Sequence, residues 1–119
     1  MKTATITAII GSIASQTAAR TIILGTHHQQ FGGDSNVAWI SGLDPCNVWT
    51  DLAQGDGSPC GKHFTIGGGV KDVHFEGCGG DLSVWQGGEK LGDCGWDPGH
   101  QGCFWGGSFD GKFTCPFPR

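Results

Sequence analysis

Hydrophobic and polar residues alternate along much of the chain after residue 60, and this pattern predicts β-strands. The clearest alternation lies in residues 70–76, where the apolar side chains of Val73 and Phe75 are interleaved with polar ones (Asp72, His74, Glu76). A period of two with opposite polarity is typical of a sheet that has one face in water. We therefore expect an antiparallel sheet with a wet face in this part of the chain.

Shorter apolar or alternating runs predict further strands. They lie at residues 21–26, 37–41, 63–66, 82–85, 103–105 and 112–115. Gly87-Gly88 predicts one tight hairpin after strand 82–85. Asp110-Gly111 is a favoured pair for a two-residue turn, so we expect a second hairpin that joins strands 103–105 and 112–115 there.

One segment has a helical pattern. In residues 46–54, Val48, Leu52 and Trp49 are spaced to share one face of a helical turn. The polar segment 27–35 is expected to be a loop or arm. The fold class that these patterns predict is all-β, a small antiparallel β-sandwich or partly closed β-barrel, with one short helix.

Composition supports this fold class and narrows the function. Glycine accounts for 23 of the 119 residues, which disfavours a mostly helical fold because each interior glycine costs a helix about 1 kcal/mol relative to alanine. The length corresponds to a single domain, which we place at residues 20–119. The net charge of -4 argues against nucleic acid as a partner, since such proteins need a basic face.

The first 19 residues are predicted to be a secretory signal peptide. Lys2 is a short positive region, residues 4–14 are an apolar segment, and small residues at 17–19 offer a cleavage site. The apolar segment is shorter than the roughly 20 residues that cross a bilayer, so we expect no membrane insertion. The expected location is secreted and extracellular.

Six cysteines follow the predicted signal peptide: Cys46, Cys60, Cys78, Cys94, Cys103 and Cys115. An even number in a secreted chain predicts three disulfides. Their spacing contains no Cys-x-x-Cys, so it supports neither a zinc ribbon nor a thioredoxin-type redox pair. The fifteen connectivities that six cysteines allow remain open at this stage.

The chain resembles the small secreted cysteine-rich proteins of filamentous fungi, the effector- or elicitor-like group. The features that carry the resemblance are the signal peptide, the even cysteine set and the hairpin run at residues 73–85. The resemblance implies extracellular action on a host or a neighbouring organism by binding rather than catalysis. Some proteins of this group are small β-barrels that dimerise. No catalytic residue carries over, because the group has none in common.

The tryptophans and phenylalanines divide into two sets. Four lie at alternating strand positions and are predicted to be core residues (Trp39, Phe64, Phe75, Trp85). Trp49, Trp96 and Trp105 lie beside cysteines or glycine-rich turns, where a rigid loop can present a flat ring to a ligand. These three are the candidate ligand-binding residues, and packing over the disulfides is the simpler alternative role for Trp49 and Trp96.

Two alternative functions are a carbohydrate-binding module for cell-wall glycans and a minimal hydrolase or ribonuclease. A ribonuclease could use Glu76 with His74 or His63 as base and acid, but it also needs a cation for the phosphate. The arginines, Arg20 and Arg119, lie at the ends of the predicted mature chain. We therefore predict that the protein is not an enzyme and uses no catalytic residue or cofactor.

The sequence also gives expectations about metal binding and about binding partners. His27 and His28, with Asp34 nearby, are metal-ligating residue types, but adjacent side chains on an extended segment point apart, so no metal site is predicted. The expected partner is an extracellular protein or a glycan. A homodimer is also expected, because the apolar run at residues 22–24 offers a strand edge that a second copy could cover.

Overall fold

The protein is built from two antiparallel β-sheets. The computed structural model describes residues 20–67 and 69–118, so the predicted signal peptide lies outside the described residues. The described residues contain nine strands and no helix: β1 (Arg20–His28), β2 (Asp34–Ile40), β3 (Thr50–Gln54), β4 (Phe64–Ile66), β5 (Val70–Glu76), β6 (Ser83–Gln86), β7 (Glu89–Asp93), β8 (Gly95–Gly102) and β9 (Ser108–Phe117). No helix of the described part is long and apolar enough to cross a membrane.

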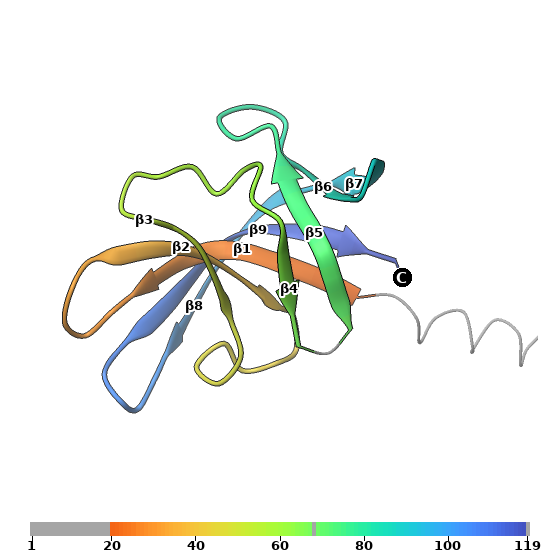
Figure 1. Cartoon of the computed structure of the whole chain (residues 1–119). Coiled ribbons are helices and arrows are strands. Elements are labelled where there is room, and N and C mark those ends of the chain that lie inside the picture. The colour runs from red at the N-terminus through yellow and green to blue at the C-terminus, as the bar shows by residue number, and fades with distance from the viewer. Residues whose placement is uncertain (1–19, 68, 119) are drawn as a thin grey trace, which may run out of the picture.

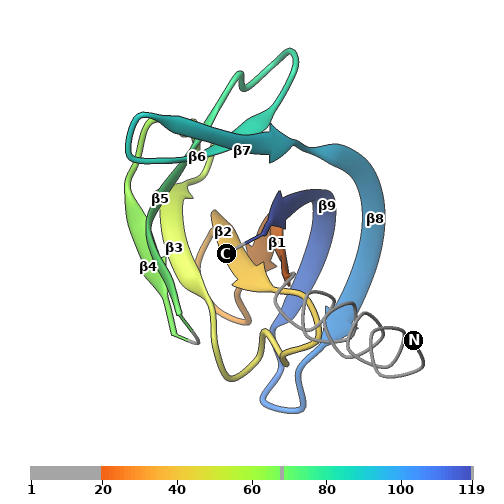
Figure 2. The same ribbon diagram turned by 90° about the vertical axis from the view of Figure 1, so that its right-hand side faces the viewer.

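The two sheets form a sandwich (Figure 1). The larger sheet has the strand order β3-β2-β1-β9-β8, and the smaller sheet has the order β4-β5-β6-β7. The chain passes directly from β7 in the smaller sheet to β8 in the larger one (Figure 2). The predicted all-β sandwich is confirmed, and the sheets do not close into a barrel.

The main core lies between the sheets. Alternate residues of β1, such as Ile22 and Leu24, face the smaller sheet and pack with Val73, Phe75 and Val84. We call this side of the larger sheet its inner face. A second cluster, formed by Val37, Trp39 and Phe109, lies on the outer face. The amphipathic alternation of the strands thus supplies two apolar layers, one on each side of the larger sheet.

The structure tests the predicted core aromatic residues. Trp39, Phe64 and Phe75 are buried, as predicted. Trp85 is only half-buried and lies on the outer face of the smaller sheet against His74, so its prediction as a core residue is wrong. The reason is the register of β6, in which Val84 rather than Trp85 turns toward the core.

Three disulfides are formed, as predicted, and no described cysteine is free. Cys60–Cys78 and Cys94–Cys115 lie beside the main core. Cys46–Cys103 lies on the outer face of the larger sheet and joins loop 41–49 to loop 103–107. Each bridge stabilises the fold by about 2–4 kcal/mol, chiefly by restricting the unfolded chain.

The predicted helix at residues 46–54 is wrong. The amides of Asn47 and Val48 both donate to the carbonyl of Asp44, which makes a single turn, and residues 50–54 then form β3. Leu52 and Ala53 are buried by pairing of β3 with β2. Burial of this edge strand outweighs the weak helical spacing, since intrinsic propensity is readily overridden by tertiary packing.

The predicted hairpin turn at Asp110-Gly111 is also wrong. Both residues lie inside β9, which pairs with β1 on one side and β8 on the other. The connection between β8 and β9 is loop 103–107, so residues 103–105 are loop rather than strand. Gly111 is needed for close packing instead of a turn, because a Cβ there would contact Ile23 and Trp39.

Three further differences concern the strand edges and the polar arm. The turn-rich segment 95–102 forms the exposed edge strand β8, and His27 and His28 belong to β1 rather than to a loop. The apolar run 22–24 has no open edge, because β1 pairs with β2 and β9. That route to a homodimer is therefore closed, while dimerisation itself stays a prediction.

Candidate functional site

Four aromatic rings gather on the outer face of the larger sheet. We call His27, Trp49, Trp105 and Phe109 the aromatic cluster. His27 stacks on Phe109 with ring centroids 4.2 Å apart, and it meets Trp49 and Trp105 edge-on at 5.1 and 5.8 Å. Two of the candidate ligand-binding residues, Trp49 and Trp105, are thus brought together with their rings 6.4 Å apart.

The imidazole of His27 is the polar centre of the aromatic cluster. The residue is 5% exposed, and neither ring nitrogen has a hydrogen-bond partner among the residues that the structure describes. Desolvation lowers the pKa of His27, although the nearby carboxylate of Asp51 acts in the opposite direction. His27 is therefore held neutral at pH 7, buried under two tryptophans.

Loops 29–33 and 103–107 lie at the end of the larger sheet away from the chain's C-terminus (Figure 1), and loop 41–49, which begins near the opposite end where Ser41 donates to Thr21, is tied to them by Cys46–Cys103. We call loops 29–33, 41–49 and 103–107 the loop end. Cys46–Cys103 joins two of the loops, and Gln30 lies against Gly106 and so brings in the third. Phe31 and Phe104 are 84% and 102% exposed, and Val48 and Trp105 of the same loops are also partly exposed. The loop end therefore carries a set of apolar side chains in water.

Trp96, the third candidate, lies apart from the other two. It is 65% exposed on the edge strand β8, and its ring meets Phe113 edge-on at 5.3 Å. Phe113 packs against the main core, so this pair belongs to the inner face of the larger sheet. The three tryptophans consequently do not form one binding site.

A chain of alternating carboxylates and imidazoles runs across the inner face. His28 Nδ1 lies 3.1 Å from Asp34 and its Nε2 donates to Asp110 at 2.8 Å. His100 Nδ1 donates to the other Asp110 oxygen at 2.6 Å. We call these four residues the Asp–His chain. They come together because β1, β2, β8 and β9 place them on neighbouring strands with their side chains on one face.

The charges within the Asp–His chain are set by these contacts. Burial disfavours a positive charge on His28, but the hydrogen bonds to Asp34 and Asp110 outweigh it and raise the pKa of His28. The hydrogen bond from His100 is the largest cause that lowers the pKa of Asp110; burial acts in the opposite direction, and the hydrogen bond from His28 adds to the lowering. An imidazole donates through both nitrogens only when it is protonated, so the geometry favours a cationic His28 between two carboxylates.

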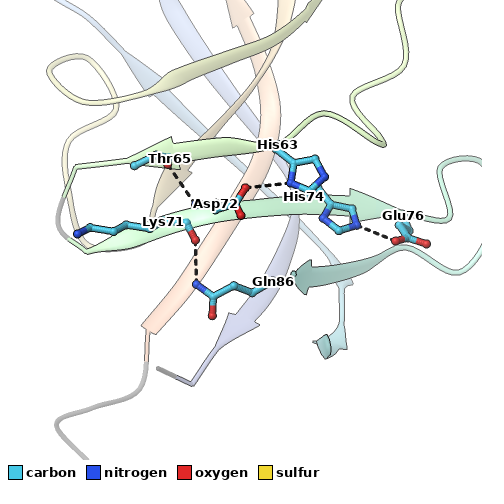
Figure 3. A network of polar contacts seen from close by, with 7 residues as sticks. All are labelled: His63, Thr65, Lys71, Asp72, His74, Glu76 and Gln86. Atoms are coloured by element: carbon cyan, nitrogen blue, oxygen red, sulfur yellow. Dashed lines mark hydrogen bonds and ion pairs between the residues drawn. The ribbon is translucent and has the colours of Figure 1, made fainter. Parts of the chain in front are cut away.

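A second polar network covers the outer face of the smaller sheet (Figure 3). His63 stacks on His74 with ring centroids 4.5 Å apart. The His63 ring donates to Asp72 at 2.9 Å, and His74 donates to Glu76 at 2.7 Å. The structure thus brings together the residues considered for a ribonuclease, but His74 is buried, contrary to the expectation of a fully wet face.

Two open cavities flank the larger sheet. The outer groove, of about 270 Å³, lies between loop 41–45 and β8, with Trp39 and Gly111 among its lining residues. The inner groove, of about 290 Å³, lies between the larger sheet and loop 77–82 of the smaller one. Both volumes are near the lower limit of about 300 Å³ that is usual for small-molecule sites.

Several of these residues were missed by the sequence analysis. The sequence around Phe31 and Phe104 has no periodic pattern from which their exposure could be predicted. Asp110 was assigned to a turn. The sequence did show that His27 and His28 would point apart, and they lie on opposite faces of β1. Within residues 20–67 and 69–118, no three His, Cys, Asp or Glu side chains converge to hold a metal ion.

Comparisons with known proteins return no match. No family model, no curated protein and no solved structure is similar to this chain. What the structure shows is a small all-β protein with three disulfides, a framework typical of oxidising, extracellular compartments.

Proposed function

We propose that this chain is a secreted, non-enzymatic, effector-like binding protein that recognises an extracellular protein partner through its loop end. The observation that carries the proposal is the exposure of Phe31 and Phe104 on neighbouring loops. Large apolar side chains that gather in water on a small soluble domain are typical of interaction sites. Aromatic residues are also the side chains that most often dominate the binding energy of protein interfaces.

The construction of the loop end supports this proposal. Cys46–Cys103 and the packing of Trp49 on Trp105 hold two of its loops in one conformation. A rigid surface loses little conformational entropy when a partner binds, which strengthens the complex. The loops contain no lysine or arginine, while Asp44 lies among them, so the partner's complementary surface would be apolar with a neutral or basic rim.

The test is a comparison of matched variants in a partner capture. The oxidised protein, immobilised, is exposed to extracellular fluid of a candidate host, and captured proteins are identified. Phe31→Ser with Phe104→Ser should abolish capture of a protein that the unchanged chain retains. Trp96→Ser, which removes another exposed ring outside the loop end, should leave capture intact. Equal capture by both variants would contradict the proposal.

A second candidate function is glycan binding, and the position of Trp96 is the observation that favours it. The ring is 65% exposed and is supported from one side by Phe113, as stacking platforms for sugars require. Soluble chitin or glucan oligomers should then quench tryptophan fluorescence, and Trp96→Ala should remove the response while Phe104→Ser retains it. Absence of quenching across such oligomers would reject this function.

The non-enzymatic part of the proposal has its own test. The His74–Glu76 pair is the acid–base arrangement that we considered from the sequence, and it lies beside His63 in Figure 3. We expect no hydrolysis of RNA or of cell-wall glycans by the purified protein. A hydrolysis rate that is measurable and is lost in Glu76→Gln would instead establish an enzyme.

A further inference from the structure

The inner groove has the build of a small-molecule site that none of the proposed functions uses. Its apolar surface comes from Leu24 and Phe113 of the larger sheet and from Leu82 of the smaller one. Pro59 and Cys78 add apolar atoms on the opposite side. The groove is open to solvent at one side and lies directly beside the main core, to which both leucines belong.

Gly79 and Gly80 line one side of the groove without a side chain. A Cβ at Gly79 would meet no atom within 4 Å, and one at Gly80 would meet only the carbonyl of Gly77, at 3.9 Å. The backbone at these two positions is therefore not crowded on its Cβ side. Covering the apolar surface of the groove with a ligand is favourable by roughly 25 cal/mol per Å² of surface removed from water.

Lys112 supplies the one charge among the residues that line the groove. A bulge in the pairing of β9 with β1 places it there: Leu24 is opposite Phe113 and Gly25 is opposite Gly111, so Lys112 is the extra residue. A bulge redirects side chains that strict alternation would send to opposite faces. Lys112 and Phe113 consequently both line the inner groove.

The ammonium group of Lys112 has no ion pair or hydrogen bond within the described residues. The acidic residue of the same strand, Asp110, is already engaged, because its two oxygens accept hydrogen bonds from His28 and His100. The polar residue on the other side of the groove is Asn36, whose amide nitrogen donates to Gly57 and leaves its carbonyl oxygen as an acceptor. The groove therefore offers one unpaired cation beside an apolar surface.

We infer that the inner groove binds a small apolar carboxylate, with the hydrocarbon part between Leu24, Leu82 and Phe113 and the carboxylate on the ammonium group of Lys112. A ligand of this class satisfies both features at once: it covers the apolar surface and neutralises the unpaired cation. A volume of about 290 Å³ suits a chain of medium length rather than a long-chain lipid.

Titration calorimetry with two matched probes, octanoate and 1-octanol, tests the inference. The two probes share the hydrocarbon chain and differ in charge. Octanoate should bind the unchanged protein at least about fivefold more tightly than octanol, the size of effect expected for a partly exposed charged hydrogen bond. In Lys112→Gln, the affinity for octanoate should fall to that for octanol, while Lys71→Gln should bind as the unchanged protein does.

A second variant fills the groove itself. Gly80→Leu adds a large side chain to the lining of the groove, and its Cβ makes only an ordinary van der Waals contact with the Gly77 carbonyl, so the fold should be retained, as circular dichroism will check. Binding of both probes should be lost. Equal affinities of the two probes for the unchanged protein, octanoate binding that survives in Lys112→Gln or Gly80→Leu, or no binding of octanoate at all would each overturn the inference.

Discussion

His27 and His28, neighbours in sequence, lie on opposite faces of β1, and their pKa values move in opposite directions. The ring of His27 is buried between Phe109 and the two tryptophans, without a hydrogen bond, and its pKa is lowered. The ring of His28 lies between Asp34 and Asp110, and its pKa is raised. Two consecutive residues of one strand thus carry a neutral and a cationic imidazole. The charge of each ring is determined by the surroundings on its own face of the sheet.

The first prediction concerns the stability of the His27→Phe variant. A phenyl ring fits the same aromatic surroundings and removes the unpaired nitrogens, whose burial costs about 1–3 kcal/mol. Because the folded pKa of His27 is lowered, the unfolded chain binds the proton first as the pH falls below about 6.5, and wild-type stability declines there. We expect His27→Phe to be more stable than wild type, with a larger advantage near pH 5 than near pH 8.

Urea denaturation at the two pH values measures this difference. His63→Phe is a suitable control, because His63 is exposed on the other sheet and lies outside the aromatic cluster. If His27→Phe is less stable than wild type at both pH values, the His27 imidazole must make a stabilising hydrogen bond. The account of a desolvated, unpaired ring is then wrong.

The second prediction concerns the Asp–His chain. The raised pKa of His28 contributes stability that is fully present below about pH 6.5 and is lost as the pH rises through the folded pKa. The lowered pKa of Asp110 contributes stability that is present above its usual pKa of 3.8 and is lost as the pH falls through the folded value. The chain should therefore stabilise the fold most between these two values, in mildly acidic surroundings.

Asp110→Asn removes the shared carboxylate of the chain. Titration of the His28 ring by NMR should show its pKa lowered in this variant, since one of its two carboxylate partners has lost its charge. Asp72→Asn changes a comparable His–Asp pair on the smaller sheet and should leave the pKa of His28 unchanged. An unaltered pKa of His28 in Asp110→Asn would show that Asp34 alone sets its charge.

The strands were predicted where burial leaves an alternating pattern and missed where it does not. β5 has Val73 and Phe75 in the main core, and the polar residues that alternate with them made the strand predictable from the sequence. β8 has no buried residue, and its glycines and proline suggested turns. An edge strand of this kind carries no periodic signal, because nothing selects apolar residues on either face.

The candidate site was predicted in its parts but not in its arrangement. Residue type and neighbouring cysteines indicated Trp49 and Trp105, and the disulfide Cys46–Cys103 is what brings them together. That pairing was one of fifteen that the cysteines allow, so local sequence could not predict the cluster. The Asp–His chain depends in the same way on strand order, which brings Asp34 and His100 to one face from distant parts of the chain.

The third prediction concerns the close approach of β1 and β9 at Gly25. A Cβ at this position would collide with the backbone carbonyl of Asp110 and with the ring of Trp39. A backbone group cannot move away cheaply, so Gly25→Ala should reduce the free energy of unfolding by about 3 kcal/mol, at the upper end of overpacking effects. Gly88→Ala, where a Cβ meets no atom within 4 Å, should change it by less than about 0.5 kcal/mol. Comparable losses in both variants, measured by urea denaturation, would contradict this packing argument.

The last prediction separates the roles of two disulfides. Cys46–Cys103 closes 57 residues and Cys60–Cys78 closes 18, so chain entropy assigns losses of about 4 and about 3 kcal/mol to their removal by paired alanine substitutions. Both are large beside a net stability of about 5–15 kcal/mol.

The two variants should differ in a second property. Removing Cys46–Cys103 frees the loops that hold Trp49 and Trp105 over His27, so tryptophan emission of the native state should shift to longer wavelength. Removing Cys60–Cys78 should not shift it, because that bridge lies beside the main core, away from the aromatic cluster. An unshifted emission in the first variant would mean that ring packing alone holds the loop end together, and the rigidity on which recognition by Phe104 depends would then come from the tryptophans rather than from the disulfide.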